Sequence, residues 1–132
     1  MKLSFKAPIF ALVAAATLAG CASTPSEIEM MADQRASLIE SSLPITVGPL
    51  NIMSAKANGN IVDITMIYNS TATIAPSALV DASASAYCKD ENVRSVLDKG
   101  VIYHINVRSE RGQMLVDKTI DSQSCLAVDQ AQ

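Results

Sequence analysis

His104, the only histidine in the chain, and Asp117 are the residues whose types come nearest to a catalytic pair. A histidine held by an aspartate acts as the base of a nucleophilic triad when a serine lies beside it. The chain has no Gly-x-Ser-x-Gly turn, and the strand pairing expected below places the two residues opposite each other on a half-exposed sheet face. Since a cross-strand charge pair is the commoner reason for such a placement, we predict that the protein is not an enzyme. A small hydrolase that uses His104 and Asp117 is the alternative.

The first 20 residues have the pattern of an export signal. Lys2 and Lys6 form a basic start, and an apolar run from Ile9 to Ala19 follows. A helix needs about 20 apolar residues to span a bilayer, so this run is too short to serve as a membrane anchor. We therefore predict a cleaved signal peptide over residues 1–20.

Cys21 follows the apolar run directly, and the tetrad Leu18-Ala19-Gly20-Cys21 resembles the bacterial lipobox. In a lipobox the cysteine thiol carries a diacylglycerol, and three acyl chains on the mature N-terminus hold a protein firmly in a membrane. Ala22 and Ser23 follow, instead of the aspartate that retains lipoproteins in the inner membrane. We therefore expect a lipidated tether over residues 21–25 that attaches a single domain, residues 26–132, to the periplasmic face of the outer membrane.

Two cysteines, Cys88 and Cys125, remain in a compartment where paired thiols in a small domain usually form a disulfide. The closed loop would stabilise the fold by about 4 kcal/mol in the chain-entropy model. A metal centre is disfavoured, because two cysteines and His104 supply at most three ligands without a close pair. A redox centre would need Cys-x-x-Cys, which is absent. We predict one structural disulfide, no metal and no cofactor.

The charge of the mature chain excludes several classes of partner. The 132 residues allow one domain. Without the leader, 8 of the 10 basic residues remain against 13 acidic ones, a net charge of −5. Nucleic acids and anionic lipid surfaces are bound through basic footprints, so neither is an expected partner.

The order of elements is predicted as α-ββ-αα-ββ, which gives an α+β fold with a four-stranded antiparallel sheet. An amphipathic helix begins near Ser26 and ends before Pro44, and two central helices cover residues 76–87 and 91–99. The helices are expected to pack on two hairpins. The first joins residues 45–57 to 60–69 around Asn58-Gly59, and the second joins residues 101–108 to 113–120.

Both hairpins leave apolar side chains on two sheet faces. A turn at Asn58-Gly59 opposes Ala55 to Val62 on one face and Leu50 to Ile67 on the other. A four-residue loop in the second hairpin opposes Ile105 to Val116 and His104 to Asp117. Helices that cover both faces would explain this pattern, and so would a surface that accepts an amphipathic helix of a partner. The predicted partner-binding residues are Leu50, Ile52, Ile61, Ile67, Ile102 and Leu115.

Several short segments, taken in order with the lipobox and the two late cysteines, resemble the type II secretion pilotins of the AspS or GspS-beta kind found in vibrios. The likeness runs from about Arg35 to Cys125. It is carried by Gly48-Pro49-Leu50-Asn51-Ile52-Met53, Met66-Ile67-Tyr68-Asn69, Tyr87-Cys88, Val93-Arg94, Leu97-Asp98-Lys99-Gly100 and Arg108-Ser109-Glu110-Arg111-Gly112-Gln113.

The resemblance implies an outer-membrane lipoprotein that binds the C-terminal helical segment of the secretin subunit. Such a protein carries the secretin along the lipoprotein sorting route and promotes assembly of its ring. The acyl groups on Cys21 would supply the address and the folded domain would hold the partner. A lipoprotein adaptor for another envelope protein is the alternative.

Overall fold

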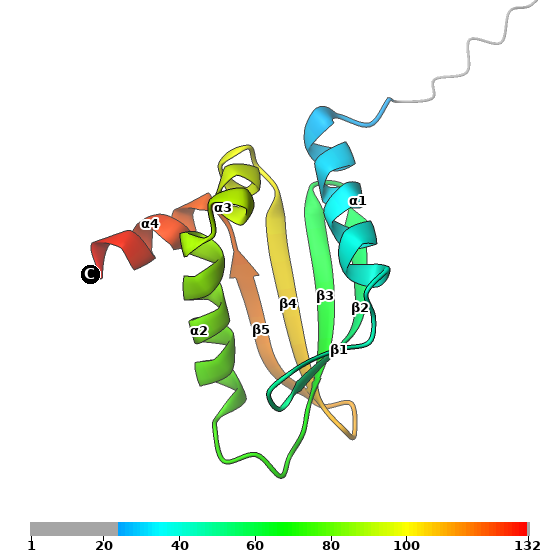
Figure 1. Cartoon of the computed structure of the whole chain (residues 1–132), viewed down its shortest axis with the longest axis vertical. Helices are drawn as coiled ribbons and strands as arrows, with labels where there is room; N and C mark the ends of the chain where they lie inside the picture. The colour runs from blue at the N-terminus through cyan, green and yellow to red at the C-terminus, as the bar shows by residue number, and fades with distance from the viewer. Residues whose placement is uncertain (1–23, 132) are drawn as a thin grey trace, which may run out of the picture.

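Five strands and four helices make up residues 24–131, the part of the chain described by the computed structural model (Figure 1). Their order is α-βββ-αα-ββ-α. They are α1 (Glu27–Glu40), β1 (Ile45–Val47), β2 (Leu50–Asn58), β3 (Ile61–Tyr68), α2 (Pro76–Lys89), α3 (Glu91–Asp98), β4 (Ile102–Ser109), β5 (Met114–Ile120) and α4 (Ser122–Gln130). The predicted leader, Cys21 and most of the predicted tether lie outside the described residues.

Local sequence signals explain where the predicted helices begin. Ser26 and Glu29 form a capping box at the start of α1, with each side chain bonded to the backbone N–H of the other residue. Pro76 occupies the first turn of α2, where no intrahelical N–H bond is lost. Asp90 caps α3 by accepting a hydrogen bond from the Val93 N–H at 3.0 Å.

The sheet has five strands in the order β1-β2-β3-β4-β5, and it is mixed. β3 and β4 run parallel, with Ile61 opposite Ile102. The predicted four-stranded antiparallel sheet is therefore wrong in detail, although the α+β class is confirmed. The segment that contains α2 and α3 returns the chain to the starting end of β3, as a parallel connection requires. The additional strand arises because a turn with Gly48 at φ +57° separates β1 from β2.

Both predicted hairpin registers are wrong by two residues. In the first hairpin, Ala55 lies opposite Ile64 and not Val62, because the turn uses Gly59 and Asn60 as its central residues. Gly59 has a φ of +61°, and no non-glycine residue in the described chain has positive φ, so the expected type I′ turn at Asn58-Gly59 does not form. In the second hairpin Ile105 lies opposite Lys118, and Asn106 rather than His104 lies opposite Asp117.

A β-bulge at Met53 changes which side of β2 faces the core. The pairing passes from Ser54–Thr65 to Ile52–Met66, and Met53 is left without a partner. Side chains alternate between the two faces of a sheet, so the extra residue sends each side chain before the bulge to the face opposite the one it would have in an uninterrupted strand. Leu50 and Ile52 consequently share the core face with Met66 and Tyr68.

All four helices pack with one face of the sheet around a single core. In Figure 1, α1 crosses β2 and β3 while α2 lies alongside β5. The buried side chains of β3 and β4 alternate strictly with half-exposed ones, so the second face of the sheet is open. Among residues 24–131, every buried residue lies between Ala32 and Cys125, so a domain that begins at residue 24 retains all of them. No helix among residues 24–131 is long and apolar enough to cross a membrane.

Candidate partner-binding groove

An apolar groove of about 160 Å³ lies between α2 and the β1–β2 turn, on the helix-covered side of the sheet. Strands β1, β2 and β3 supply its floor and one rim, and α2 supplies the opposite wall. Its lining residues are Val47, Leu50, Ile52, Met66, Ser83, Ala86 and Tyr87.

The chain builds this groove from three local features. The bulge at Met53 points Leu50 and Ile52 into it, and the Gly48 turn folds β1 back so that Val47 forms the rim opposite Leu50. Small side chains on α2, including Ser83 and Ala86, leave space between the helix and the sheet. The groove therefore depends on irregular positions as well as on regular strands.

The groove is uncharged. Leu50, Ile52 and Met66 form a floor that is at most 7% exposed, whereas the rim residue Val47 is 55% exposed. Tyr87 packs its ring against Tyr103, with 5.5 Å between centroids. Burial raises the pKa of the Tyr87 phenol, so this side chain stays neutral at physiological pH. The arrangement suits apolar side chains of a partner, with Val47 accessible for first contact.

The six predicted partner-binding residues are divided between the two sides of the sheet. Leu50 and Ile52 lie in the groove, whereas Ile61, Ile67 and Ile102 are half-exposed on the open face. Leu115 is 40% exposed and lies in β5, two positions before Asp117. The prediction that Leu50 and Ile52 share a sheet face with Ile67 is wrong, because the bulge at Met53, which was not predicted, turns the segment that carries Leu50 and Ile52 toward the core.

The sequence analysis did not identify Val47, Met66, Ser83, Ala86 and Tyr87 as part of this site. One usable signal was Tyr87, because residues 24–131 have only three aromatic side chains and this one begins the Tyr87-Cys88 segment of the resemblance. The small residues of α2 gave a second signal, since short Ala and Ser side chains do not fill the space between a helix and the sheet beneath it.

His104 lies on the open face between two aspartates. Its Nδ1 is 2.5 Å from Oδ1 of Asp63, and its Nε2 is 2.9 Å from Oδ1 of Asp117. Hydrogen bonds to Asp117 and then to Asp63 raise the pKa of His104 above its ordinary value of 6.5. Both ring nitrogens are engaged by carboxylates, so neither is directed at a serine hydroxyl as a triad base would be. The predicted cross-strand charge pair thus becomes a cluster of three residues.

The described residues hold no group of three or more His, Cys, Asp or Glu side chains that converges on a metal position. In the cluster around His104 the carboxylates bind opposite nitrogens of the ring and do not converge on a shared point. The arrangement therefore neutralises the imidazolium without forming a cation site.

Replacing His104 with glutamine should remove a pH-dependent part of the stability. A raised folded pKa means that the stabilisation is fully present below about pH 6.5 and is lost as the pH rises through the folded pKa. The His104 side chain is 30% exposed and those of Asp63 and Asp117 are 37% and 58% exposed, so solvent screens the attraction between them. We therefore expect the free energy of unfolding to fall by at most about 1 kcal/mol. Urea unfolding between about pH 5.5 and about pH 8.5 measures it. Parallel pH profiles for His104→Gln and the unmodified protein would contradict this assignment.

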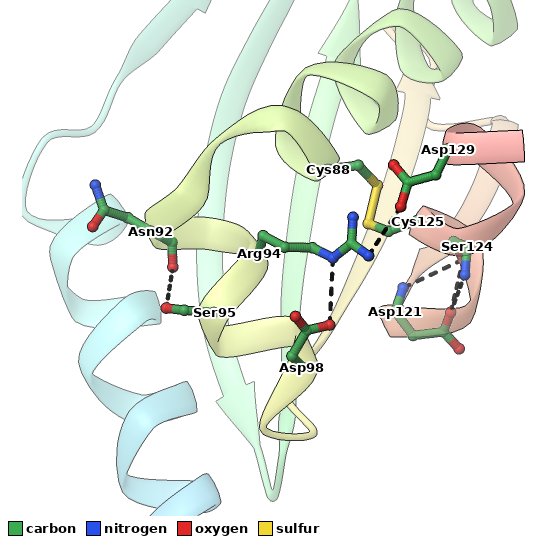
Figure 2. Close-up of polar contacts among 9 residues, drawn as sticks. All are labelled: Cys88, Asn92, Arg94, Ser95, Asp98, Asp121, Ser124, Cys125 and Asp129. Atoms are coloured by element: carbon green, nitrogen blue, oxygen red, sulfur yellow. Dashed lines mark hydrogen bonds and ion pairs between the residues drawn. A yellow bond between two sulfur atoms is a disulfide. The ribbon is translucent and has the colours of Figure 1, made fainter. Parts of the chain in front are cut away.

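The two late cysteines form the predicted disulfide. Cys88 near the end of α2 is bonded to Cys125 in α4, with 5.2 Å between their Cα atoms (Figure 2). Arg94 of α3 bridges the same region, 3.4 Å from Asp98 and 3.1 Å from Asp129 of α4. The disulfide thus fixes the C-terminal helix beside the wall of the groove.

Comparison with known proteins relates most of the described chain to one family. The family model described as "Type II secretion system (T2SS) pilotin, S protein" matches residues 24–125. The pilotin EpsS of Vibrio vulnificus is 43% identical, with a TM-score of 0.69 over 74% of this chain and 91% of that one. The lipoprotein YghG of Escherichia coli K12 is 26% identical over 82% of this chain and 81% of its own length.

A further solved structure contains a pilotin together with its partner. In the ETEC pilotin–secretin complex AspS–GspD, the matched chain is 23% identical, with a TM-score of 0.54 over 80% of this chain and all of that one. At this identity the likeness concerns the fold.

Proposed function

Since this chain belongs to the type II secretion system pilotin family, we propose that it binds the C-terminal segment of a secretin. We further propose that it promotes the delivery of the secretin to the outer membrane and the assembly of its ring. Proteins of this family are secretion adaptors and not enzymes, in agreement with the engagement of both His104 nitrogens.

The apolar groove between α2 and β1 is the observation that carries the proposal. An amphipathic helix places apolar residues at positions i, i+3, i+4 and i+7, and such a row fits an elongated apolar surface. Leu50, Ile52 and Met66 offer a buried floor, and Val47 and Tyr87 flank it. The relative AspS is seen with the secretin GspD, which supports a secretin as the occupant here.

The membrane address is proposed to be the lipid on Cys21. The domain itself offers no described helix that could span a bilayer, and its acidic balance disfavours adhesion to anionic lipid. A lipoprotein among the relatives supports acylation of this chain. Thr24 and Pro25 are exposed, as a tether between the lipid and α1 should be.

Replacing Cys21 with serine should separate delivery from binding. Without acyl chains the pilotin and the secretin bound to it lose the membrane address, so we expect secretin multimers in the outer-membrane fraction to fall by about tenfold or more. Sucrose-gradient fractionation of the host cell, followed by immunoblotting of the secretin, measures the change.

The purified domain from residue 24 onward is the control, because it has the groove but no lipid. It should bind a peptide of the secretin C-terminus with the affinity of the lipidated protein in detergent. Normal secretin multimers in outer membranes of Cys21→Ser cells would overturn the proposed address. Capture of a different envelope protein, with no secretin bound, would favour the adaptor alternative.

A further inference from the structure

A second pocket, of about 160 Å³, lies between α1 and α3 and has a different chemical character. Met31 and Val96 form its apolar part. Its polar lining is Gln34, Arg35, Ser95 and Lys99, so two cations and no carboxylate border this space.

The two cations of this pocket lack ionic partners within the described chain. Arg35 donates one hydrogen bond, from Nη2 to the backbone oxygen of Asn92 at 3.3 Å. Neither Arg35 nor Lys99 forms an ion pair with any residue in 24–131. By contrast Arg94, in the same layer of helices, is held by Asp98 and Asp129 (Figure 2). The positive charge of the α1–α3 pocket is therefore available to a ligand.

Two carboxylates at the ends of α3 are already engaged. Asp98, next to Lys99 in the chain, pairs with Arg94 at 3.4 Å, and Asp90 accepts a hydrogen bond from the Val93 N–H. In a mature chain with an acidic excess of five, two cations bordering one pocket with an apolar part form a local exception. A carboxylate suits such a place, because guanidinium and ammonium groups bind it through charge-assisted hydrogen bonds.

Two tyrosines connect this pocket to the apolar groove. Burial raises the pKa of the Tyr103 phenol, and the positive charge of Arg35 opposes that rise. Tyr103 in turn packs against Tyr87, a lining residue of the groove. Figure 1 shows all these helices over the same face of the sheet, with α1 over β2 and β3 and the α2–α3 pair toward β5. Both sites thus lie on the helix-covered side of the sheet, the basic pocket between α1 and α3 and the apolar groove between α2 and the β1–β2 turn.

We propose that the α1–α3 pocket binds an acidic side chain of the partner helix and so sets the direction in which that helix lies. The acidic residue lies at the Arg35 and Lys99 end, and the apolar residues lie on Leu50 and Ile52. This inference rests on the proposed function, since the partner helix is the secretin segment. It adds a charge requirement to the partner, which an apolar groove alone does not impose.

The test measures binding of a synthetic peptide of the host's secretin C-terminus to the domain from residue 24 onward. Calorimetry compares the unmodified domain with Arg35→Gln and Lys99→Gln at about 50 mM and about 500 mM NaCl. The matched control is Lys56→Gln, which removes one positive charge from an exposed position on the strand face away from the groove.

We expect each pocket variant to weaken binding at low salt by about tenfold and to reduce its salt dependence, while Lys56→Gln changes the affinity by less than about twofold. A second set of peptides replaces one acidic residue at a time with lysine. At one position this change should weaken binding to the unmodified domain, and Arg35→Glu should restore the affinity for that peptide. Tight binding that neither pocket variant alters would overturn the charge requirement and leave the proposed function intact. A secretin segment without acidic residues would overturn it as well. Absence of any binding by the unmodified domain would overturn both.

Discussion

Replacing Ala86 with glutamate should weaken binding of the secretin C-terminal peptide by at least about 100-fold, or more than about 2.7 kcal/mol. Ala86 is exposed on α2 and lines the apolar groove, so the new carboxylate enters the space that the partner's apolar side chains fill. Burying a charge without a partner at an interface is costly, and the longer side chain also fills part of the groove. Calorimetry with the domain from residue 24 onward measures the affinity.

The matched control is Ala78→Glu on the same helix. Ala78 is also exposed but does not line the groove, so the same charge is added while the binding surface is untouched. Ala78 lies in the first turn of α2, where the helix dipole favours a carboxylate, and Ala86 lies in the last turn, so the stability of each variant is measured separately. Thermal unfolding of both variants should resemble that of the unmodified domain. Equal affinities for Ala86→Glu and Ala78→Glu, with both variants folded, would place the partner elsewhere.

Replacing both Cys88 and Cys125 with alanine should lower the free energy of unfolding by about 4 kcal/mol. The disulfide closes a loop with a sequence separation of 37 residues, and both cysteines are buried in the core. Its main effect is to restrict the unfolded chain, and for a small domain this is a large part of the total stability. Urea denaturation of the double variant and of the unmodified domain gives the difference.

The reduced, unmodified domain provides the control for packing, because it lacks the bond and retains both sulfur atoms. Its stability should agree with that of the double variant within about 1 kcal/mol, since Cys-to-Ala changes remove little volume. If the double variant lost less than about 1 kcal/mol, the loop closure would not be a major source of stability.

Most elements of this fold follow from local sequence signals, although the strand β1 and the C-terminal helix α4 were not predicted. Ser26 and Glu29 start the first helix as a capping box, Pro76 starts the second, and the segments that flank Gly59 and Gly112 form strands joined by turns. The pairing of Cys88 with Cys125 followed from the compartment and the cysteine count. The helix starts and turns depend on short stretches of chain, and the disulfide depends on the number of cysteines, so the sequence alone was sufficient for both.

The direction in which β3 and β4 pair was not accessible in the same way. Antiparallel pairing was assumed throughout, whereas β3 and β4 pair in parallel through backbone bonds such as that from Ile102 N to Asn60 O at 2.9 Å. The alternation of apolar residues in these strands is the same for either direction of pairing. Only the position of the α2–α3 connection decides between them, and that is a property of the complete fold.

The groove was missed for a more local reason. Without the bulge at Met53, Leu50 and Ile52 would lie on the open face with Ile67, as the sequence analysis assumed. No residue type marks a bulge in Ile52-Met53-Ser54, since none of these residues requires unusual backbone angles. The turn at Gly48-Pro49 was missed as well, because residues 45–57 were interpreted as one continuous strand although a Gly-Pro pair indicates a turn. Sequence therefore identified two floor residues of the site but placed them on the wrong surface.

The central claim is that a secretin segment lies along the helix-covered side of the sheet, in the groove between α2 and β1. Chemical-shift mapping tests it most directly, with the isotope-labelled domain titrated with the secretin C-terminal peptide. We predict the largest amide shifts at Val47, Ile52 and Tyr87, with little change at Ile67 and Ile102 on the open face. Saturable shifts centred on Ile67 and Ile102, with the groove unperturbed, would contradict the account.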